Sequence, residues 1–357
     1  RLDLLAAGVQ RMNGKKLKES PMTPTIKPPK LHLGDVIGFY SPSSPATSFA
    51  PKRFRRAKKY LQDKGFQLKA GDLTGKSAGY RSGTISERVE ELNNLIRDPD
   101  VRCIMSTIGG MNSNSLLPYI DYDALRKDPK ILIGYSDATA ILLSVYAKTG
   151  LLTFYGPALV ASFGEFEPLV SITYHGFENM LATPSLVPYT YKMPEFWSQE
   201  FINWEDQDRA KEKFPNQWLT VEGGKVQGRV MGGNLNTFHG FWGSEYMPDI
   251  REGDILFIED SLHTAATVER SFSLLKVSGI FDKVAGIILG KHELFDDQGT
   301  NVKPHQLLLE VLNGQKLPIL AEFDCCHTHP MFTLPLGVQI ELDATNKRVT
   351  VLEKWLS

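Results

Sequence analysis

A serine in a sharp turn is the first residue of this chain whose position suggests covalent chemistry. Ser136 lies in a Gly-Tyr-Ser-Asp turn after the apolar run Ile131–Gly134, and a helical pattern follows over 138–148. Such a serine projects its hydroxyl above the edge of a sheet, and the amides that open the helix can bind a developing oxyanion. The Gly-x-Ser-x-Gly pattern of common hydrolases is not met, because Ala138 replaces the second glycine. The alternative is that Ser136 only caps the helix.

A general base for Ser136 would have to be a histidine, because a serine hydroxyl becomes nucleophilic near neutral pH only when a base takes its proton. Among the eight histidines, His327 and His329 lie in a loop between two apparent strands. Pro330 and Gly337 restrict that loop, and a positioned base requires such rigid support.

The carboxylate that orients the base can come from the end of an apolar strand. Glu259 and Asp260 follow Leu256–Ile258 directly. Successive side chains of a strand point to opposite faces, so only one of the two acids can reach the imidazole. On its own, Glu259 could equally be a carboxylate at the protein surface.

The same loop raises a metal site as an alternative, because Cys325, Cys326, His327 and His329 lie close together in the sequence. Adjacent residues rarely bind one ion, however, and no second pair of ligands has zinc spacing. With Cys103 the chain has three cysteines, which do not form a disulfide framework. We therefore expect no metal, no organic cofactor and a reducing cytoplasm.

Two adjacent glycines, Gly109 and Gly110, would let the backbone approach a substrate closely. We expect an oxyanion hole made of the amide of Asp137 and the amide of Gly110 or its neighbour. Asn112 and Ser113 would then bind a polar group of the substrate. A plain turn is the alternative, whereas a phosphate cradle is disfavoured because neither glycine-rich phosphate motif occurs.

Composition places the chain among ordinary globular proteins. It has 357 residues, 42% of them hydrophobic and 23% charged, with a net charge of −1. This charge gives no field to attract a nucleic acid or an anionic membrane. No apolar run reaches the roughly 18 to 20 residues that span a bilayer. The length favours two domains.

Short apolar runs alternate with amphipathic segments from residue 33 onward, which predicts an α/β fold with a mostly parallel sheet. The strands are predicted at 36–40, 66–70, 103–108 and 130–135, and the helices at 51–64, 84–97 and 138–148. Thr84 and Glu87 form a capping box for the second helix. Ligands of such sheets bind beyond the carboxyl ends of the strands, where three loops converge: 41–47, 109–115 and 134–138.

The alternation of apolar and amphipathic segments, and its interruptions, divide the chain into four parts. We expect 1–30 to be a flexible extension or a cloning remnant, and 31–175 to be a domain that carries Ser136. The aromatic and charged segment 176–225 is predicted to be a linker with a lid-like insertion, followed by a β-rich domain at 226–357. That domain has predicted strands at 225–231, 254–258, 285–289, 338–342 and 348–352, a helix at 267–278, and a Gly-Gly-Asn-Leu-Asn turn at 232–236 of open role.

Three motifs together resemble one known family. Gly-Tyr-Ser-Asp at 134–137, Phe-Ile-Glu-Asp at 257–260 and His-Thr-His-Pro-Met-Phe-Thr-Leu-Pro-Leu-Gly at 327–337 are similar, in this order, to the serine peptidases of the LD-carboxypeptidase family. The similarity covers about 33–352. It implies an N-terminal domain of Rossmann-like or flavodoxin-like fold that carries the serine, and a β-rich C-terminal α/β domain that carries the acid and the base.

The resemblance also assigns roles within a Ser-Glu-His triad. It places the nucleophile at Ser136, the orienting acid at Glu259 and the base at His327, and it implies a homodimer. His329 is then a structural or substrate-facing residue.

Within the family, the chain is most similar to the microcin C immunity peptidases. Ser-Thr-Ile-Gly-Gly-Met-Asn-Ser at 106–113 departs from the Arg-Gly-Gly-Tyr-Gly text of the muropeptide-trimming members. The segment with Trp197 and Trp204 also resembles the immunity branch, in which an aromatic residue stacks on the nucleotide part of the antibiotic. Such stacking contributes roughly 1 to 3 kcal/mol. The resemblance does not say which tryptophan stacks.

The leading hypothesis is a cytoplasmic serine amidase that cleaves the peptide–nucleotide or aminoacyl–nucleotide amide of microcin C-like antibiotics. The second is an LD-carboxypeptidase that trims terminal D-alanine from murein tetrapeptides, and the third is a non-catalytic binding protein with two lobes. The expected partners are small peptides, peptidyl nucleotides or muropeptides, not a nucleic acid polymer or a membrane.

Overall fold

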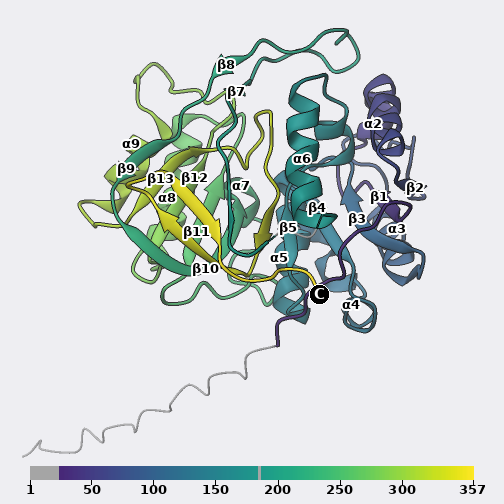
Figure 1. Ribbon diagram of the computed structural model, residues 1–357, viewed down its shortest axis with the longest axis horizontal. Coiled ribbons are helices and arrows are strands. Elements are labelled where there is room, and N and C mark those ends of the chain that lie inside the picture. The colour runs from purple at the N-terminus through teal and green to yellow at the C-terminus, as the bar shows by residue number, and fades with distance from the viewer. Residues whose placement is uncertain (1–23, 184–185) are drawn as a thin grey trace, which may run out of the picture.

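Two β-sheets lie side by side in the computed structural model, which describes residues 24–183 and 186–357 (Figure 1). The predicted extension 1–30 falls mostly outside the described residues. Its described end is built into the fold, because Ile26 bridges to Leu151 and its amide donates to the carbonyl of Gly150 at 2.9 Å.

The first sheet has the order β14-β5-β4-β3-β1-β2. Its first five strands in the chain are parallel, and their central members are apolar and buried on both faces, as expected for a parallel sheet covered by helices. The strands are β1 (Val36–Tyr40), β2 (Gln67–Ala70), β3 (Val101–Ser106), β4 (Ile131–Gly134), β5 (Thr153–Tyr155) and β14 (Leu334–Leu336).

Helices cover the first sheet, and local sequence signals explain where two of them begin. Pro51 opens α2, where a missing N–H costs nothing. Thr84 and Glu87 make the predicted capping box at the start of α3, each accepting a hydrogen bond from the other's amide. The helical segments are α1 (Ala46–Phe49), α2 (Pro51–Asp63), α3 (Ile85–Arg97), η1 (Ser113–Tyr119), α4 (Tyr122–Lys127), η2 (Ser136–Ala138), α5 (Thr139–Thr149), η3 (Leu159–Phe163) and α6 (Leu169–Leu181).

The second sheet has the order β6-β16-β15-β10-β11-β12-β13-β9. Its parallel centre, from β10 to β13, is extended by antiparallel strands on both sides. Its elements are β6 (Tyr189–Thr190), β9 (Leu219–Glu222), β10 (Lys225–Asn234), α7 (Leu235–Phe238), β11 (Ile255–Glu259), α8 (Ala265–Val277), β12 (Gly286–Gly290), α9 (Pro304–Leu312), β13 (Ile319–Phe323), β15 (Gln339–Asp343) and β16 (Arg348–Val351). The predicted mixed α/β fold with a strand-rich second half is confirmed.

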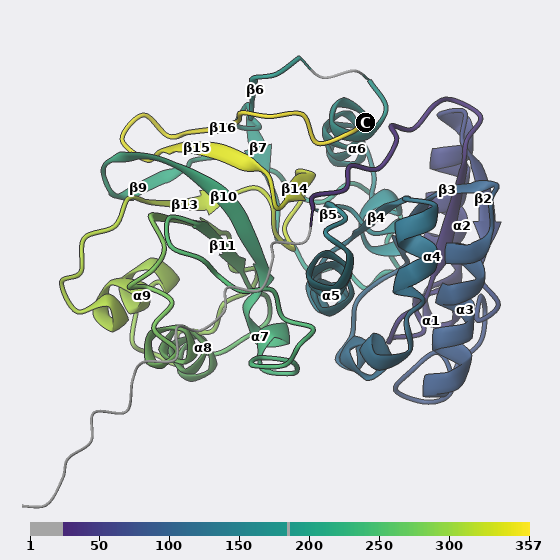
Figure 2. The same cartoon turned by 90° about the horizontal axis from the view of Figure 1, so that it is seen from below.

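The segment 176–225 enters both halves of the molecule. It starts within α6, and its strands β6 and β9 pair with β16 and β13 at opposite edges of the second sheet. Between them lies a separate two-stranded sheet of β7 (Phe196–Trp197) and β8 (Phe214–Pro215). Conversely β14, from the C-terminal part of the chain, pairs antiparallel with β5 of the first sheet (Figure 2). The two halves are therefore interlocked.

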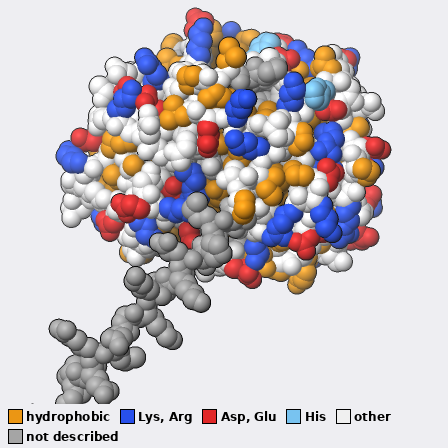
Figure 3. Space-filling view, turned by 60° about the horizontal axis from the view of Figure 1, so that its bottom comes forward, with side chains coloured by type: hydrophobic (Ala, Val, Ile, Leu, Met, Phe, Trp, Pro, Cys, Tyr) orange, Lys and Arg blue, Asp and Glu red, His pale blue; other side chains and the backbone are white. Residues whose placement is uncertain are grey.

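The surface agrees with the balanced composition. Lys and Arg side chains are interspersed with Asp and Glu side chains on the face that Figure 3 shows. In the part of the chain that the structure describes, no helix is both long and apolar enough to cross a membrane.

A glycine at the junction of β10 and β11 gives a test of this packing. Gly232 has φ +148°, and a Cβ there would lie 1.7 Å from the carbonyl oxygen of Phe257, so the backbone would have to move. We expect Gly232→Ala to lower the free energy of unfolding by about 2 kcal/mol or more.

The matched control is Gly176→Ala within α6, where a Cβ meets its nearest atom at 3.8 Å. This change should leave stability equal or higher by about 0.5 to 1 kcal/mol, because alanine favours a helix. Denaturant unfolding of both variants checks the pair, and equal stabilities would contradict the packing described for Gly232.

Candidate active site

The turn at Ser136 has the strained geometry of a nucleophile elbow. Ser136 follows β4 directly, and its φ of 61° lies in the left-handed region that a serine rarely adopts. The helix-cap alternative does not hold, because the capping residues of η2 and α5 are Tyr135 and Ala138, and neither end has a side-chain cap. The strain exposes the serine to the space beyond the sheet edge.

Glu259 and His327 form a direct pair. Glu259 is the last residue of β11 and is fully buried. The Nδ1–H of His327 donates to its Oε2 at 2.7 Å, which leaves Nε2 of the imidazole for another partner. Within the described residues no hydrogen bond joins Ser136 to His327.

The electrostatics of the pair favour an ionised acid and a charged base. Burial alone would raise the pKa of Glu259, but His327 and the hydrogen bonds around the carboxylate hold that pKa below its ordinary value. Burial alone would lower the pKa of His327, but the Glu259 carboxylate outweighs burial and raises the pKa to about 9.

Tyr155, at the end of β5, connects the serine turn to this pair. Its hydroxyl donates to Oε1 of Glu259 and accepts a hydrogen bond of 3.1 Å from the amide of Ser136. Asn234, at the end of β10, donates to the same Oε1 at 3.1 Å. One buried carboxylate thus fixes the base and the backbone of the serine turn.

Two backbone amides near Ser136 are the predicted donors of an oxyanion hole. A Cβ at Gly109 would lie 2.9 Å from the amide nitrogen of Asp137 and 3.0 Å from Oγ of Ser136, so only a glycine leaves this space open. Gly110 has φ +140°, and its amide meets no protein acceptor within the described residues. Gly110 and Asp137 both lie on the wall of the cavity that Ser136 lines.

A cavity of about 670 Å³ collects these groups. Its wall includes Ser136, Gly110 and His327, and also Trp204 from the 176–225 segment. The ring of Trp204 stacks on that of Phe49, with 6.1 Å between centroids. The structure therefore brings together the predicted serine, base, oxyanion amides and one predicted tryptophan.

The other predicted substrate-binding residues lie elsewhere. Trp197 is in β7, with the Lys291 ammonium 5.5 Å from its ring centroid, and it is not part of the cavity wall. Asn112 and Ser113 are not part of it either, and their neighbours Met111 and Asn114 are.

The side chain of Ser113 instead supports the serine turn. Its hydroxyl and amide donate to Oδ2 of Asp137 at 2.6 and 2.9 Å. Burial raises the pKa of Asp137, and these hydrogen bonds oppose the rise. Asp137 thereby contributes its amide to the cavity while its side chain ties η2 to η1.

Asp260 does not pair with the base. Its Oδ1 accepts from Asn234 at 3.2 Å and lies 3.4 Å from Nε2 of His263. Burial and the neighbouring Glu259 raise the pKa of Asp260 to about 7. This geometry agrees with the alternation argument that only one of the two acids reaches the imidazole, and the acid that does so is the one that the resemblance selected.

The cysteine–histidine cluster engages the backbone. The thiol of Cys325 contacts the carbonyls of Tyr155 and Phe332, and that of Cys326 contacts Phe323 and Thr328. No group of three or more Cys, His, Asp or Glu side chains able to hold a metal occurs among the described residues.

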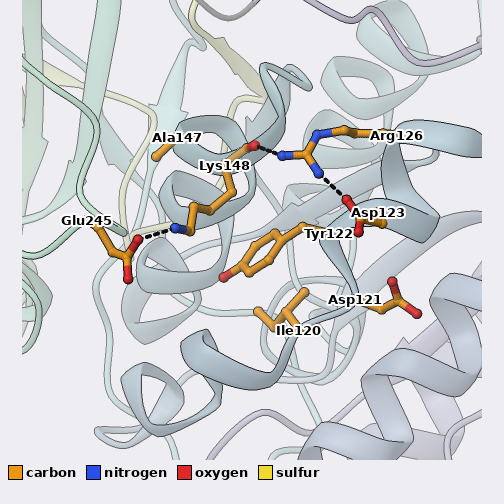
Figure 4. Close-up of a pocket in the computed structure, with 8 residues that line it drawn as sticks. All are labelled: Ile120, Asp121, Tyr122, Asp123, Arg126, Ala147, Lys148 and Glu245. Atoms are coloured by element: carbon orange, nitrogen blue, oxygen red, sulfur yellow. Dashed lines mark hydrogen bonds and ion pairs between the residues drawn. The ribbon is translucent and has the colours of Figure 1, made fainter. Parts of the chain in front are cut away.

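A second hollow, of about 480 Å³, lies between α4, α5 and the loop at Glu245 (Figure 4). Its charged side chains are engaged with one another: Lys148 pairs with Glu245, and Arg126 pairs with Asp123 and with the carbonyl of Lys148. This hollow brings no nucleophile and base together.

Sequence reasoning missed Tyr155 and Asn234. Asn234 belongs to the Gly-Gly-Asn-Leu-Asn turn at 232–236. The sequence pattern drew attention to this turn but did not indicate what Asn234 does. No nearby sequence pattern indicated a role for Tyr155, because a tyrosine at the end of an apolar run is expected to be a buried core residue.

Comparisons with known proteins agree with this geometry. The LD-carboxypeptidase N-terminal domain model matches residues 37–156, and the C-terminal domain model matches 227–342. A Vibrio cholerae protein that carries a carboxypeptidase name is 59% identical over 91% of this chain and 97% of its own length. The microcin C7 self-immunity protein MccF of Escherichia coli is 57% identical over 92% of this chain and 96% of its own.

Solved structures agree as well. MccF in complex with aspartyl sulfamoyl adenosine superposes with a TM-score of 0.91 at 57% identity, covering 93% of this chain and 100% of that one. These matches define the chain as a serine-type peptidase. It belongs to the LD-carboxypeptidase family, as its three motifs indicated.

The coupling of His327 to Glu259 predicts a pH dependence. A general base acts in its neutral form, so kcat/KM should rise with pH and level off only above about 9. Glu259→Gln removes the charge that raises the pKa of His327. The rise of kcat/KM with pH should therefore occur at lower pH in this variant. Initial rates against pH, with an NMR titration of His327 as a readout independent of turnover, check this. An unchanged His327 titration in the variant would contradict the coupling.

Proposed function

We propose that this peptidase hydrolyses the amide that joins a peptide or an amino acid to a nucleotide in microcin C-like antibiotics. The observation that carries the proposal is that His327, bonded to the buried Glu259 at 2.7 Å, lies on the wall of the same cavity as the strained Ser136 and Trp204. The likeness to MccF, whose solved complexes include aspartyl sulfamoyl adenosine and glutamyl sulfamoyl guanosine, supports the substrate class.

The proposed reaction has two steps. Oγ of Ser136 attacks the carbonyl carbon while Nε2 of His327 takes its proton, and the contact between them forms as the substrate closes the site. The amides of Asp137 and Gly110 bind the oxyanion, and loss of one such donor costs roughly 10² to 10³ in rate. His327 then protonates the leaving amine, and a water molecule releases the acyl group from Ser136 by the reverse sequence. Glu259 keeps the imidazole oriented throughout.

The aromatic wall fits a nucleotide leaving group. Trp204 lies on the cavity and rests against Phe49 on one side and the guanidinium of Arg53, 4.5 Å from its ring centroid, on another. These contacts hold the ring in place, and the part of it that borders the cavity is where we propose that a base packs. Trp204, not Trp197, is therefore the tryptophan we assign to the substrate.

Murein tetrapeptides are the second candidate substrate. A murein peptide carboxypeptidase of Bacillus subtilis is 28% identical over 93% of this chain, which supports this alternative at the level of the family. The same triad would release terminal D-alanine. Assembly as a homodimer and residence in the cytoplasm stay predictions.

Turnover of two substrates by the wild-type enzyme and by a Ser136 variant tests the proposal. Wild-type enzyme should hydrolyse an aminoacyl sulfamoyl adenosine with a higher kcat/KM than a murein tetrapeptide. Ser136→Ala should lower kcat by more than about a thousandfold on either substrate, because the nucleophile is lost. The matched control is Ser115→Ala, in the neighbouring η1 segment and outside the cavity wall, which should keep wild-type rates.

The outcomes separate the candidates. Preference for the tetrapeptide would replace the antibiotic assignment with the murein one. Wild-type activity in folded Ser136→Ala would reject the serine mechanism. Tight binding of the adenosine compound without turnover by the wild-type protein would favour the non-catalytic binding protein.

A further inference from the structure

Two nitrogen groups on the wall of the same cavity are not used by the proposed mechanism. Lys211 and His329 both line it, and their side chains are only 5% and 7% exposed. Lys211 comes from the 176–225 segment, and His329 lies two residues beyond the proposed base. A buried ammonium and a buried imidazole normally have hydrogen-bond partners.

The partner expected for Lys211 is Glu165, but that carboxylate is already satisfied. It accepts hydrogen bonds from Arg53 at 3.2 Å, from Gln207 at 2.6 Å and from the amide of Phe166 at 2.9 Å. The Lys211 ammonium lies 3.7 Å from it, beyond hydrogen-bond distance. Lys211 thus has an ion pair with Glu165 but no hydrogen bond within the described residues, and it lines the cavity.

The imidazole of His329 also lacks a hydrogen-bond partner. Its Nδ1 is buried and has no hydrogen-bond partner, and its Nε2 lies 3.8 Å from Glu165. The backbone that carries the ring is held in place, because the amide and the carbonyl of His329 are both bonded to the backbone of Ser198. Nε2 makes no hydrogen bond within the described residues either, so a ligand atom in the cavity can complete it.

The surroundings place these donors beside the aromatic wall. Arg53 contacts Trp204 through its guanidinium and Glu165 through Nη2, so Trp204 and the Glu165 cluster share one neighbour. Glu293, also on the cavity wall, is held by the hydroxyl of Ser261 at 2.6 Å and lies within the electrostatic reach of Lys211. Burial lowers the pKa of the Lys211 ammonium, and the charges of Glu165 and Glu293 oppose that fall.

We propose that Lys211 and His329 form a subsite for an anionic oxygen of the substrate, either a phosphoryl or a carboxylate oxygen. Lys211 supplies the charge and His329 supplies a fixed N–H, in the manner of other charge-assisted pairs. The subsite deepens the proposed function, because it lies in the cavity where that substrate would bind. A purely structural Lys211 would be a second counterion of Glu165 and would not distinguish charged from neutral ligands.

Binding of AMP and adenosine tests the phosphoryl arm without any turnover. Titration calorimetry should show that the wild-type protein binds AMP more tightly than adenosine. Lys211→Met should weaken AMP binding by about tenfold and leave adenosine binding unchanged. Lys211→Arg should restore most of the difference. The control Lys213→Met removes an exposed lysine of the same segment and should bind both ligands like wild type.

The carboxylate arm uses a murein tetrapeptide and its C-terminal amide. A carboxylate subsite predicts a lower KM for the free acid in the wild-type enzyme and loss of that preference in Lys211→Met. Whichever preference disappears identifies the anion. If Lys211→Met does not fold, His329→Asn provides the same comparison with one donor removed.

The proposal is overturned if the folded variants keep the wild-type preferences on both arms, or if the wild-type protein shows neither preference. The AMP measurement does not depend on Ser136. Failure of the hydrolytic function would therefore leave the binding result standing, and failure of the subsite would leave hydrolysis standing.

Discussion

The buried carboxylate of Glu259 is the group on which the rest of the site depends. An unpaired buried charge costs several kcal/mol, so it must be surrounded by donors. His327, Tyr155 and Asn234 each direct a hydrogen bond to it from a different segment of the chain. Tyr155 at the same time accepts from the amide of Ser136. Satisfying one charge therefore fixes the base and the serine turn in a common frame.

That frame exists only when the two sheets are docked. Ser136 and Tyr155 follow strands of the first sheet, whereas Glu259 follows β11 of the second. The halves are held closely, because Thr139 accepts from the amide of Asn234 at 3.1 Å and a Cβ at Gly233 would lie 2.6 Å from the Thr139 side chain. β14 adds a strand from the C-terminal half to the first sheet. Neither half alone holds the complete site.

The sequence predicted what is local and missed what is long-range. The mostly parallel sheet and the capping box at Thr84 follow from periodicity and from residues three positions apart, and both were predicted. The pairing of Glu259 with His327 needed the family resemblance, because 68 residues separate them. Tyr155 and Lys211 carried no pattern, since a buried tyrosine and a lysine in a charged loop are ordinary until the tertiary structure places the tyrosine against Glu259 and the lysine on the cavity wall.

The central claim is that Ser136 is activated by His327 and Glu259 across the two sheets, and covalent labelling tests it most directly. A serine-directed fluorophosphonate, followed by peptide mass spectrometry, should modify the wild-type protein at Ser136 in a one-to-one ratio. The rate of labelling should fall by at least about a hundredfold in folded His327→Ala and Glu259→Gln variants. Labelling at another serine, or equal rates in all three proteins, would contradict the account.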